Sequence, residues 1–426
     1  MKLERAKGTR DFNVEDKIIR QEISDILRKV FEKYGFNPIE TPVLERLDTL
    51  TMKYGGGEEI VKEIFKLKDQ GNRDLGLRYD LTIPFSRYVG MNPTLNMPFK
   101  AYRMGIVFRD GPIKLGRYRE FWQCDVDVVG AKSVLFEVEM IKLIQEAFRE
   151  LKLEVVIKIN NRKILDGILD YVGIQKDKRD TVMLTLDKVE KLENKKIIDE
   201  LKEKGIDDLK IKKLLKEVYV SAFKNKEIIG ELKEKLKDNE GLREIEEIFK
   251  YIDDNNVILS PSMARGLSYY TGTIFEVYLK KREIKSSLAA GGRYDEIIGK
   301  FLGKGDYPAL GVSFGLDVIT DVLKLKEEKK KKSLADIYII PIKTIEESLK
   351  IVGELRKNNF KVDVDYNGRG ISSNLRYCNA LGIKKVIIIG NKDLANNEVT
   401  IRNMESGEEK KVKLDKVVEN LWFGFY

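Results

Sequence analysis

The stretch that decides the fold is FRDGPIKLGRYREFWQCDVDVVG, residues 108–130. Residues 105–108 form an apolar lead-in, and a Gly-Pro turn follows at residues 111–112. After the loop, apolar and polar side chains alternate, which is typical of an extended strand with one face buried. The pattern therefore predicts two strands joined by a loop.

This hairpin carries side chains that a solvated surface hairpin rarely concentrates. Its arginines are Arg109, Arg117 and Arg119. Alternation places Phe121, Gln123 and Asp127 at predictable faces of the second strand. A guanidinium group holds phosphate in a fixed planar geometry, and a ring such as Phe121 stacks on a nucleobase. We therefore interpret the hairpin as a nucleotide-binding element.

Absent motifs narrow the kind of nucleotide site. The sequence contains no GxxxxGK[ST] loop, and the glycines at residues 55–57 open no GxGxxG fingerprint. A Walker-type or dinucleotide-binding fold is thus disfavoured. Bound ATP would have to be held by side chains on a sheet.

The composition excludes several kinds of chemistry. The 426 residues include no histidine, and cysteine occurs only as Cys124 and Cys378. A Cys/His zinc cluster, a disulfide framework and a hydrolase triad with a histidine base are therefore ruled out. What remains is catalysis by orientation and electrostatic stabilisation, with Mg²⁺ held by carboxylates and no resident metal expected.

The length, hydrophobic content and charge of the chain limit its domain number, its compartment and the kind of partner it binds. The length and the 42% hydrophobic content predict two or three domains with substantial cores. The beginning of the chain shows no apolar signal region, and no segment looks long and apolar enough to span a membrane, so we expect a cytoplasmic protein. Lysine and arginine exceed the acidic residues by 79 to 70, a net charge of +9 that is compatible with an RNA partner.

Periodicity predicts the other elements. We expect helices at 15–35, from Pro84 and at 133–151, a proline-containing edge strand at 36–45, a hairpin at 63–68 and 75–80, and strands at 153–159 and 273–279. Residues 161–255 are Lys/Glu/Leu/Ile-rich and helical in period, which indicates an inserted helical module. A charged tether at 324–333 precedes a small α/β domain, mainly parallel, with strands at 337–341, 361–366, 386–389, 398–403 and 410–414 and helices at 345–358, 371–381 and 415–422.

Five motifs in order carry a family resemblance: KGTRD (7–11), YDLT (79–82), the arginine-rich hairpin, RGLSYY (265–270) and GGRYD (291–295). With them the whole chain resembles histidyl-tRNA synthetases, which are class II aminoacyl-tRNA synthetases. The resemblance implies an α+β fold and a homodimer, with the Pro42 strand near the dimer interface. It implies a catalytic antiparallel sheet at 1–160 and 256–324, an inserted helical domain at 161–255, a linker at 325–334 and an anticodon-binding domain at 335–426.

The resemblance also implies the reaction and its residues. ATP, with Mg²⁺ assisting the phosphates, would activate L-histidine as an adenylate before its transfer to tRNA(His). Arg109 and Arg265 would act at the α-phosphate, Arg117 at the distal phosphates, and Phe121 would stack on adenine. The histidine site would consist of Asp80, Thr82, Gln123, Asp127, Tyr269, Tyr270 and Tyr294, with Asp127 and Tyr270 facing the two imidazole nitrogens.

Each assignment has a structural alternative. Tyr269 and Tyr294 could be packed core aromatics, and Arg265 could belong to a structural ion pair. Asp80 could cap the helix at Pro84. Arg10 and Asp11 are read as structural residues.

One position departs from the class II pattern. Class II enzymes usually carry an arginine at the start of the third-motif helix, where this chain has Val318 in GLDVI. Either Arg117, Arg119 or Arg293 replaces it, or ATP binding is weakened.

Three other functions remain open at this point. The chain could be a histidine-sensing regulatory paralogue, such as the regulatory subunit of ATP phosphoribosyltransferase, without charging activity. It could also be a tRNA-binding sensor domain or a different class II synthetase. Intact Arg109 and Arg265, together with a terminal domain, favour the ligase.

The missing histidines generate a prediction of their own. A synthetase without its own amino acid can be translated when its charged tRNA is depleted, although compositional drift would account for the same absence. When histidylation is blocked in cells, pulse labelling should show this chain's synthesis falling less than that of histidine-containing proteins. An equal fall would refute the advantage.

Overall fold

The computed structural model describes residues 2–51, 61–113, 116–189, 193–219, 224–264, 269–281, 284, 286–303, 305–326 and 331–423. The chain divides into two compact units: residues 1–10 with 22–325, and residues 11–21 with 326–426. Each unit is described by itself. No helix of the described part is long and apolar enough to cross a membrane.

The larger unit is built on a sheet of eight described strands. In spatial order they are β1 (Asn37–Pro38), β5 (Phe99–Phe108), β6 (Glu120–Val129), β11 (Ala309–Gly315), β10 (Ala289–Arg293), β9 (Thr273–Leu279), β7 (Val155–Asn161) and β8 (Val257–Leu259). The strands from β5 to β7 pair antiparallel, and only the outer pairs β1–β5 and β7–β8 are parallel. The predicted hairpin is therefore present as β5–β6, and β9 has the predicted bounds.

Alternation along β6 divides the sheet into two faces. Val126 and Cys124 point to one face, which helices cover, and Asp125 and Asp127 point to the other. Register brings Arg103 of β5 and Ser313 of β11 opposite Asp125. Because directly opposed residues share a face, the polar side chains form cross-strand rows.

Helices cover both faces. α1 (Val14–Lys33) and α5 (Leu135–Glu150) pack on one side, where the rings of Phe31 and Phe148 lie 5.4 and 5.7 Å from that of Phe314. α4 (Thr82–Met91) and α12 (Ile297–Leu302) contribute to the core of the other side. α13 (Leu316–Lys326) continues directly from β11.

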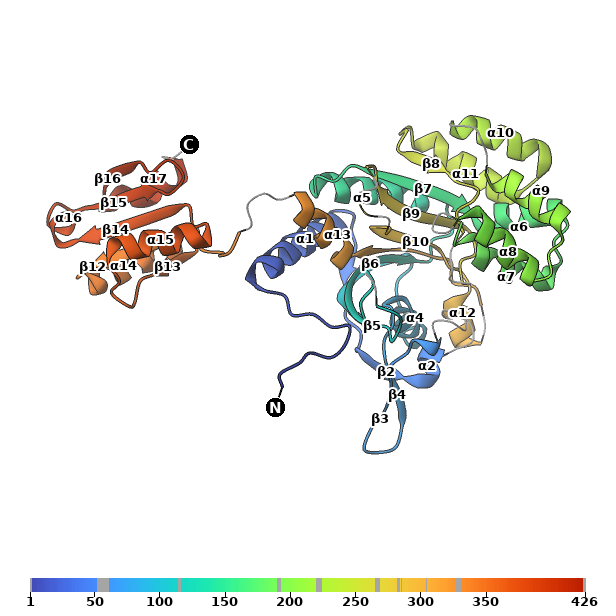
Figure 1. Ribbon diagram of the computed structural model, residues 1–426, viewed down its shortest axis with the longest axis horizontal. Helices are drawn as coiled ribbons and strands as arrows, with labels where there is room; N and C mark the ends of the chain where they lie inside the picture. Colours follow the sequence, from blue (N-terminus) through green and yellow to red (C-terminus); the bar gives the residue numbers. More distant parts are fainter. Residues whose placement is uncertain are drawn as a thin grey trace. The chain divides into compact units, whose positions relative to one another are not determined.

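Six described α-helices lie in sequence between β7 and β8 and group beside the β7–β9 end of the sheet (Figure 1). They are α6 (Arg162–Val172), α7 (Arg179–Leu186), α8 (Asn194–Glu203), α9 (Asp208–Val218), α10 (Asn225–Lys235) and α11 (Glu240–Tyr251), with a 3₁₀ turn η1 (Lys176–Lys178). A small antiparallel sheet contains β2 (Leu44–Arg46), β4 (Asp74–Leu77) and β3 (Lys66–Lys68), beside α2 (Leu47–Thr51). The 36–45 strand is therefore two short strands in different sheets, because its prolines interrupt the pairing.

The smaller unit holds a five-stranded sheet within the described residues. Its order is β13 (Val362–Val364), β12 (Ile337–Ile342), β14 (Lys385–Gly390), β15 (Glu398–Asn403) and β16 (Glu409–Lys413). Its helices are α14 (Ile345–Lys357), α15 (Ile371–Leu381), α16 (Asn391–Ala395) and α17 (Val417–Phe423), with η2 (Leu414–Lys416). The first three strands are parallel and the last two antiparallel, so the sheet is more mixed than predicted.

The structure adds one helix and shortens the predicted tether. The short helix α16 was not predicted, because five residues are too few to show a helical period. α13 extends to Lys326, which is three residues into the tether predicted at 324–333, and residues 327–330 lie outside the described part.

A close approach between β6 and β11 yields a prediction. A Cβ on Gly311 would lie 1.8 Å from Asp127 Oδ1, whereas one on Gly315 would meet nothing nearer than 3.6 Å. Gly311→Ala should therefore lower the melting temperature markedly, since the buried carboxylate must move, and Gly315→Ala should leave it nearly unchanged. Calorimetry of both variants tests this, and equal melting temperatures would contradict it.

Candidate active site

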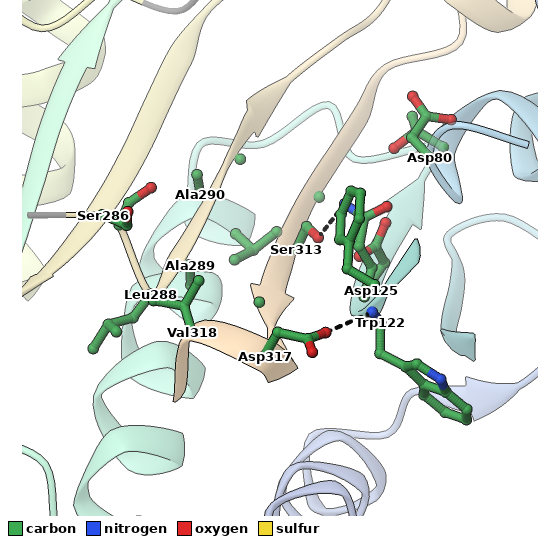
Figure 2. A pocket seen from close by; sticks show the side chains of 18 of the residues that line it. Asp80, Trp122, Asp125, Ser286, Leu288, Ala289, Ala290, Ser313, Asp317 and Val318 are labelled. Carbon is green, nitrogen blue, oxygen red and sulfur yellow. Dashed lines mark hydrogen bonds between the residues drawn. The ribbon is translucent and has the colours of Figure 1, made fainter. Parts of the chain in front are cut away.

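A cavity of about 500 Å³ opens over the sheet face that carries the polar rows (Figure 2). Its wall includes all the described residues predicted to bind ligands: Asp80, Thr82, Arg109, Arg117, Phe121, Gln123, Asp127, Tyr269, Tyr270 and Tyr294. They come from the start of α4, the loop between β5 and β6, β6 itself, the segment before β9 and the residue after β10. Arg265 lies outside the described residues, so the structure says nothing of its position.

The floor of the cavity is made by β6 and its neighbour β11. Gln123 and Asp125 project from β6 toward the smaller side chain of Ser313. Gln123 Nε2 donates to Ser313 Oγ at 2.9 Å (Figure 2). Gln123 Oε1 and Asp125 Oδ1 are buried and have no hydrogen-bond partner among the residues that the structure describes. Two buried acceptors on one strand therefore lie at the cavity without a donor from the described part of the chain.

Asp127 is held by two partners at the deep end of the floor. Arg103 donates to its Oδ2 and the Tyr294 hydroxyl donates to its Oδ1. Burial acts to lower the pKa of Arg103, but the charges of Asp127 and Asp125 outweigh it and raise that pKa. Burial together with the charge of Asp127 raises the pKa of Tyr294 well above its usual value. Tyr294 is therefore a neutral donor and Arg103 a permanent cation.

Two other carboxyl groups of the cavity titrate near neutrality. Burial raises the pKa of Asp125 to about 7, although Arg103 opposes the shift. Burial likewise raises the pKa of Asp80 to about 6, opposed by its hydrogen bond from Ile83 N–H (3.0 Å) and by the charge of Arg109. The bond from Ile83 shows that Asp80 stabilises the first turn of α4, as the capping alternative expected, while Asp80 also lines the cavity. The site carries carboxylates that a cationic ligand would stabilise in the ionised form.

Arg109 connects the acidic floor with the aromatic wall. Its Nε donates to Tyr79 O at 3.1 Å, and its guanidinium carbon lies 5.1 Å from the centre of the Phe121 ring. Burial lowers its pKa, against the charge of Asp80. Arg117 forms a 2.7 Å ion pair with Glu63, which also lines the cavity. The cavity thus combines cations, an exposed aromatic face and buried carboxylates.

Tyr269 and Tyr294 have a core role as well. Their rings lie 6.1 Å apart, and both belong to the hydrophobic cluster between α4 and α12. The packed-aromatic alternative is therefore correct as a description of their surroundings, while both rings also line the cavity.

The start of α13 forms another part of the wall. Val318 lines the cavity at the place where the class II pattern has arginine. Arg293 cannot replace it, because Glu137 holds its Nε and Nη2 at 2.7 Å each and Ala131 O accepts from its Nη1 at 2.6 Å. Arg119 pairs with Asp110 at 2.9 Å and is not among the residues that line the cavity. Of the three proposed replacements, Arg117 alone lines it.

Sequence reasoning missed several site residues. Asp125 and Arg103 are the most important, and the two-residue period of β6 contained the signal for Asp125, which lies between Gln123 and Asp127. Arg103 faces it across the β5–β6 register, which the sequence pattern alone did not specify. Asp187, at the end of α7, lines the cavity from the inserted helices.

Comparisons with known proteins agree with this architecture. A family model described as "Histidyl-tRNA synthetase" matches residues 8–319, and one described as "Anticodon binding domain" matches residues 336–422. The chain is 43% identical to "Histidine--tRNA ligase 1" of Bacillus cereus over 98% of this chain and 99% of that protein. It is 34% identical to "Histidine--tRNA ligase" of Pyrococcus furiosus, covering 98% of each.

Solved structures show the same fold. The crystal structure of histidyl-tRNA synthetase from Nostoc sp. PCC 7120 superposes with a TM-score of 0.88 at 28% identity, covering 99% of both chains. An ATP phosphoribosyltransferase regulatory subunit/histidyl-tRNA synthetase from Bacillus halodurans superposes with a TM-score of 0.74 at 21% identity, over 91% of this chain and 98% of that one.

The catalytic sheet joined to an anticodon-binding domain defines the chain as an aminoacyl-tRNA synthetase. Within that class it belongs to the histidyl-tRNA synthetase family, whose reaction is the ligation of histidine to tRNA. The resemblance seen in the motifs is thereby confirmed.

The raised pKa of Asp125 predicts how stability depends on pH. Its folded-state pKa of about 7 exceeds the usual value of about 3.9. Between about pH 3.9 and pH 7 the folded chain therefore binds more protons than the unfolded chain. The free energy of unfolding consequently falls as the pH rises through this range. Without ligand, Asp125→Asn should melt above wild type at pH 8, with a smaller difference at pH 5.

Calorimetry at both pH values checks this expectation. Asp74→Asn is the matched control, because that carboxylate is 63% exposed and outside the cavity. An Asp125→Asn variant that melts below wild type at pH 8 would contradict the burial argument.

Proposed function

We propose that the chain activates L-histidine with ATP to histidyl-adenylate and then transfers the histidyl group to tRNA(His). In the first step a histidine carboxylate oxygen attacks the α-phosphorus, the bond to the bridging oxygen breaks, and diphosphate leaves with its electron pair. In the second, a terminal ribose hydroxyl of the tRNA attacks the acyl carbon and loses its proton, the bond from the acyl carbon to the phosphate oxygen breaks, and AMP leaves with the electron pair. The first step removes no proton from the attacking atom, which suits a chain without histidine.

The unpartnered acceptors of β6 are the observation that carries the proposal. Within the described ranges, Asp125 Oδ1 and Gln123 Oε1 are buried without donors, and an ammonium group supplies such donors with a compensating charge. Asp80 and Thr82 line the same cavity and would complete the ammonium site. We therefore add Asp125 to the histidine-binding residues that the sequence had predicted.

Imidazole recognition would use Asp127 and Tyr270. Asp127 already accepts from Arg103 and Tyr294, yet a carboxylate offers about four lone-pair sites, so it has capacity for an imidazole N–H. Tyr269 and Tyr294 would wall the ring. Arg103 is the buried positive charge paired with Asp127.

The nucleotide would lie along Phe121 and Arg109. Arg109 is the residue that interacts both with Asp80 and with the Phe121 ring, so it lies where an α-phosphate would join the amino acid to adenosine. Arg117 would release Glu63 to bind distal phosphates. The family resemblance adds Arg265 at the α-phosphate.

We infer that Mg²⁺ would bind this site together with the phosphates of ATP. Among the described residues no group of three or more Cys, Asp or Glu side chains is placed to hold a metal ion. Mg²⁺ commonly binds through substrate phosphates, waters and one or two carboxylates, so Glu63 beside Arg117 is our candidate for such a carboxylate. When bound, the ion would neutralise phosphate charge.

The remaining assignments follow the resemblance. We propose the domain division stated above, a cytoplasmic homodimer with the Pro42 segment near its interface, and contact of the 161–255 insertion with the tRNA acceptor arm. Asp187 supports the last assignment, since it brings the insertion to the rim of the cavity.

The regulatory alternative has less support. The Bacillus halodurans protein shares the fold at 21% identity, whereas the relatives at 34–43% identity over nearly the whole chain are named ligases. The regulatory function would predict histidine binding without ATP–diphosphate exchange.

ATP–diphosphate exchange with each of the twenty amino acids tests the function. Histidine alone should support exchange and charging of unfractionated tRNA, and Arg265→Ala should abolish both. Histidine binding without exchange would favour the regulatory alternative.

Substitution of Asp125 tests the ammonium site. Asp125→Asn should raise the KM for histidine roughly tenfold or more, because a charge-assisted hydrogen bond is lost, while the KM for ATP changes little. Asp74→Asn is again the control. An unchanged KM for histidine would remove Asp125 from the ligand site.

A further inference from the structure

The first motif of the chain, residues 7–10, lies against the loop that joins β5 and β6. We call these residues the N-terminal strap. Arg119 N donates to Gly8 O at 3.0 Å. Gly8 has a φ of +89°, and a Cβ there would lie 2.8 Å from the Arg119 side chain, so this contact requires glycine. The strap and the loop therefore have matched shapes.

Arg10 ends the strap with two strong contacts. Its guanidinium carbon lies 3.4 Å from the centre of the Tyr118 ring, which is a close cation–π stack. It also pairs with Asp317 Oδ1, on a carboxylate whose side chain is only 5% exposed. One side chain thus links the β5–β6 loop to the first turn of α13.

Asp317 extends the connection to β6. Its Oδ2 accepts from Trp122 N at 2.8 Å (Figure 2). Tyr118, Trp122 and Asp317 all line the cavity, as does Val318. Arg10 itself does not line the cavity, so it affects the cavity wall only through its contacts with Tyr118 and Asp317.

We propose that Arg10 is a positioning residue for ATP, holding the wall formed by Tyr118, Trp122 and Asp317 in its binding geometry. This inference rests on the proposed function of the same cavity and adds a residue to it. Arg10 pairs with Asp317, the residue directly before Val318, and so places a positive charge beside the position where class II enzymes usually have an arginine. Arg293 cannot supply that charge, because it pairs with Glu137. The strap explains why a motif so distant in sequence belongs to the site.

The direction of the effect follows from burial. Without Arg10, the nearly buried carboxylate of Asp317 loses one ion pair and Tyr118 loses a stacking contact. Both changes loosen the nucleotide wall while leaving the β6 carboxylates in place. The loss should therefore fall on ATP and not on histidine.

The experiment measures kcat and both KM values in histidine-dependent ATP–diphosphate exchange with the full-length chain. Arg10→Ala should raise the KM for ATP roughly tenfold and change the KM for histidine less than about twofold. Arg10→Lys keeps the charge without the planar stack and should fall between. The Arg10→Ala/Asp317→Asn double variant should be less impaired than the product of the single effects.

Controls separate this role from general stability. Arg46→Ala removes an ion pair with Asp48 whose side chains are 77% and 63% exposed, and it should change neither KM. If Arg10→Ala does not fold, Arg10→Lys and Asp317→Asn carry the same test. Equal rises in both KM values, or none, would overturn the proposal.

Titration calorimetry with ATP alone distinguishes failure of this inference from failure of the proposed function. A wild-type chain that binds ATP but supports no exchange would contradict the catalytic proposal. The ATP affinity of Arg10→Ala would still test whether Arg10 positions the ATP-binding wall. Wild-type exchange with unchanged ATP affinity in Arg10→Ala would refute the strap alone.

Discussion

A buried arginine on the β5 strand of the catalytic sheet is the constraint on which the site depends. Arg103 lies 2% exposed on β5, opposite Asp125 and bonded to Asp127. An ion pair at such a position costs desolvation on both sides and is tolerated only with close geometry. Arg103 supplies the positive charge that Asp125 and Asp127 face, and the rest of the site is arranged around that charge.

Small residues on the neighbouring strand make this arrangement possible. Gly311 leaves room for the Asp127 carboxylate, and Ser313 hydrogen-bonds Gln123. The remaining acceptors, Asp125 Oδ1 and Gln123 Oε1, find no partner in the part of the chain that the structure describes. Such groups lower stability in the unliganded protein and become favourable when a cationic ligand satisfies them, which is why pKa shifts of this kind gather at functional sites. Binding specificity and a modest loss of stability thus share one physical origin.

Much of the fold was predictable because its strands and helices have clear periods. The alternation in β6 and the long amphipathic run of α1 predicted their elements, and β15 and α15 have the predicted bounds. The short α16 and the split of residues 36–45 were missed, because neither spans enough residues for a period to appear. In the site, all ten described candidates line one cavity, although their contacts with ligands stay predictions. Asp125 was overlooked despite lying in phase with Gln123 and Asp127.

The sequence by itself determined the family, the hairpin and the residue types available for chemistry, because motifs and local periods depend only on near neighbours along the chain. Tertiary structure decided which charges meet. Arg10 pairs with Asp317 across 307 positions, while Arg293 is diverted to Glu137 and is lost to the nucleotide site. It also decided that Asp125 titrates near neutrality, since desolvation depends on everything packed around a carboxyl group. No local pattern contains those distances or that burial.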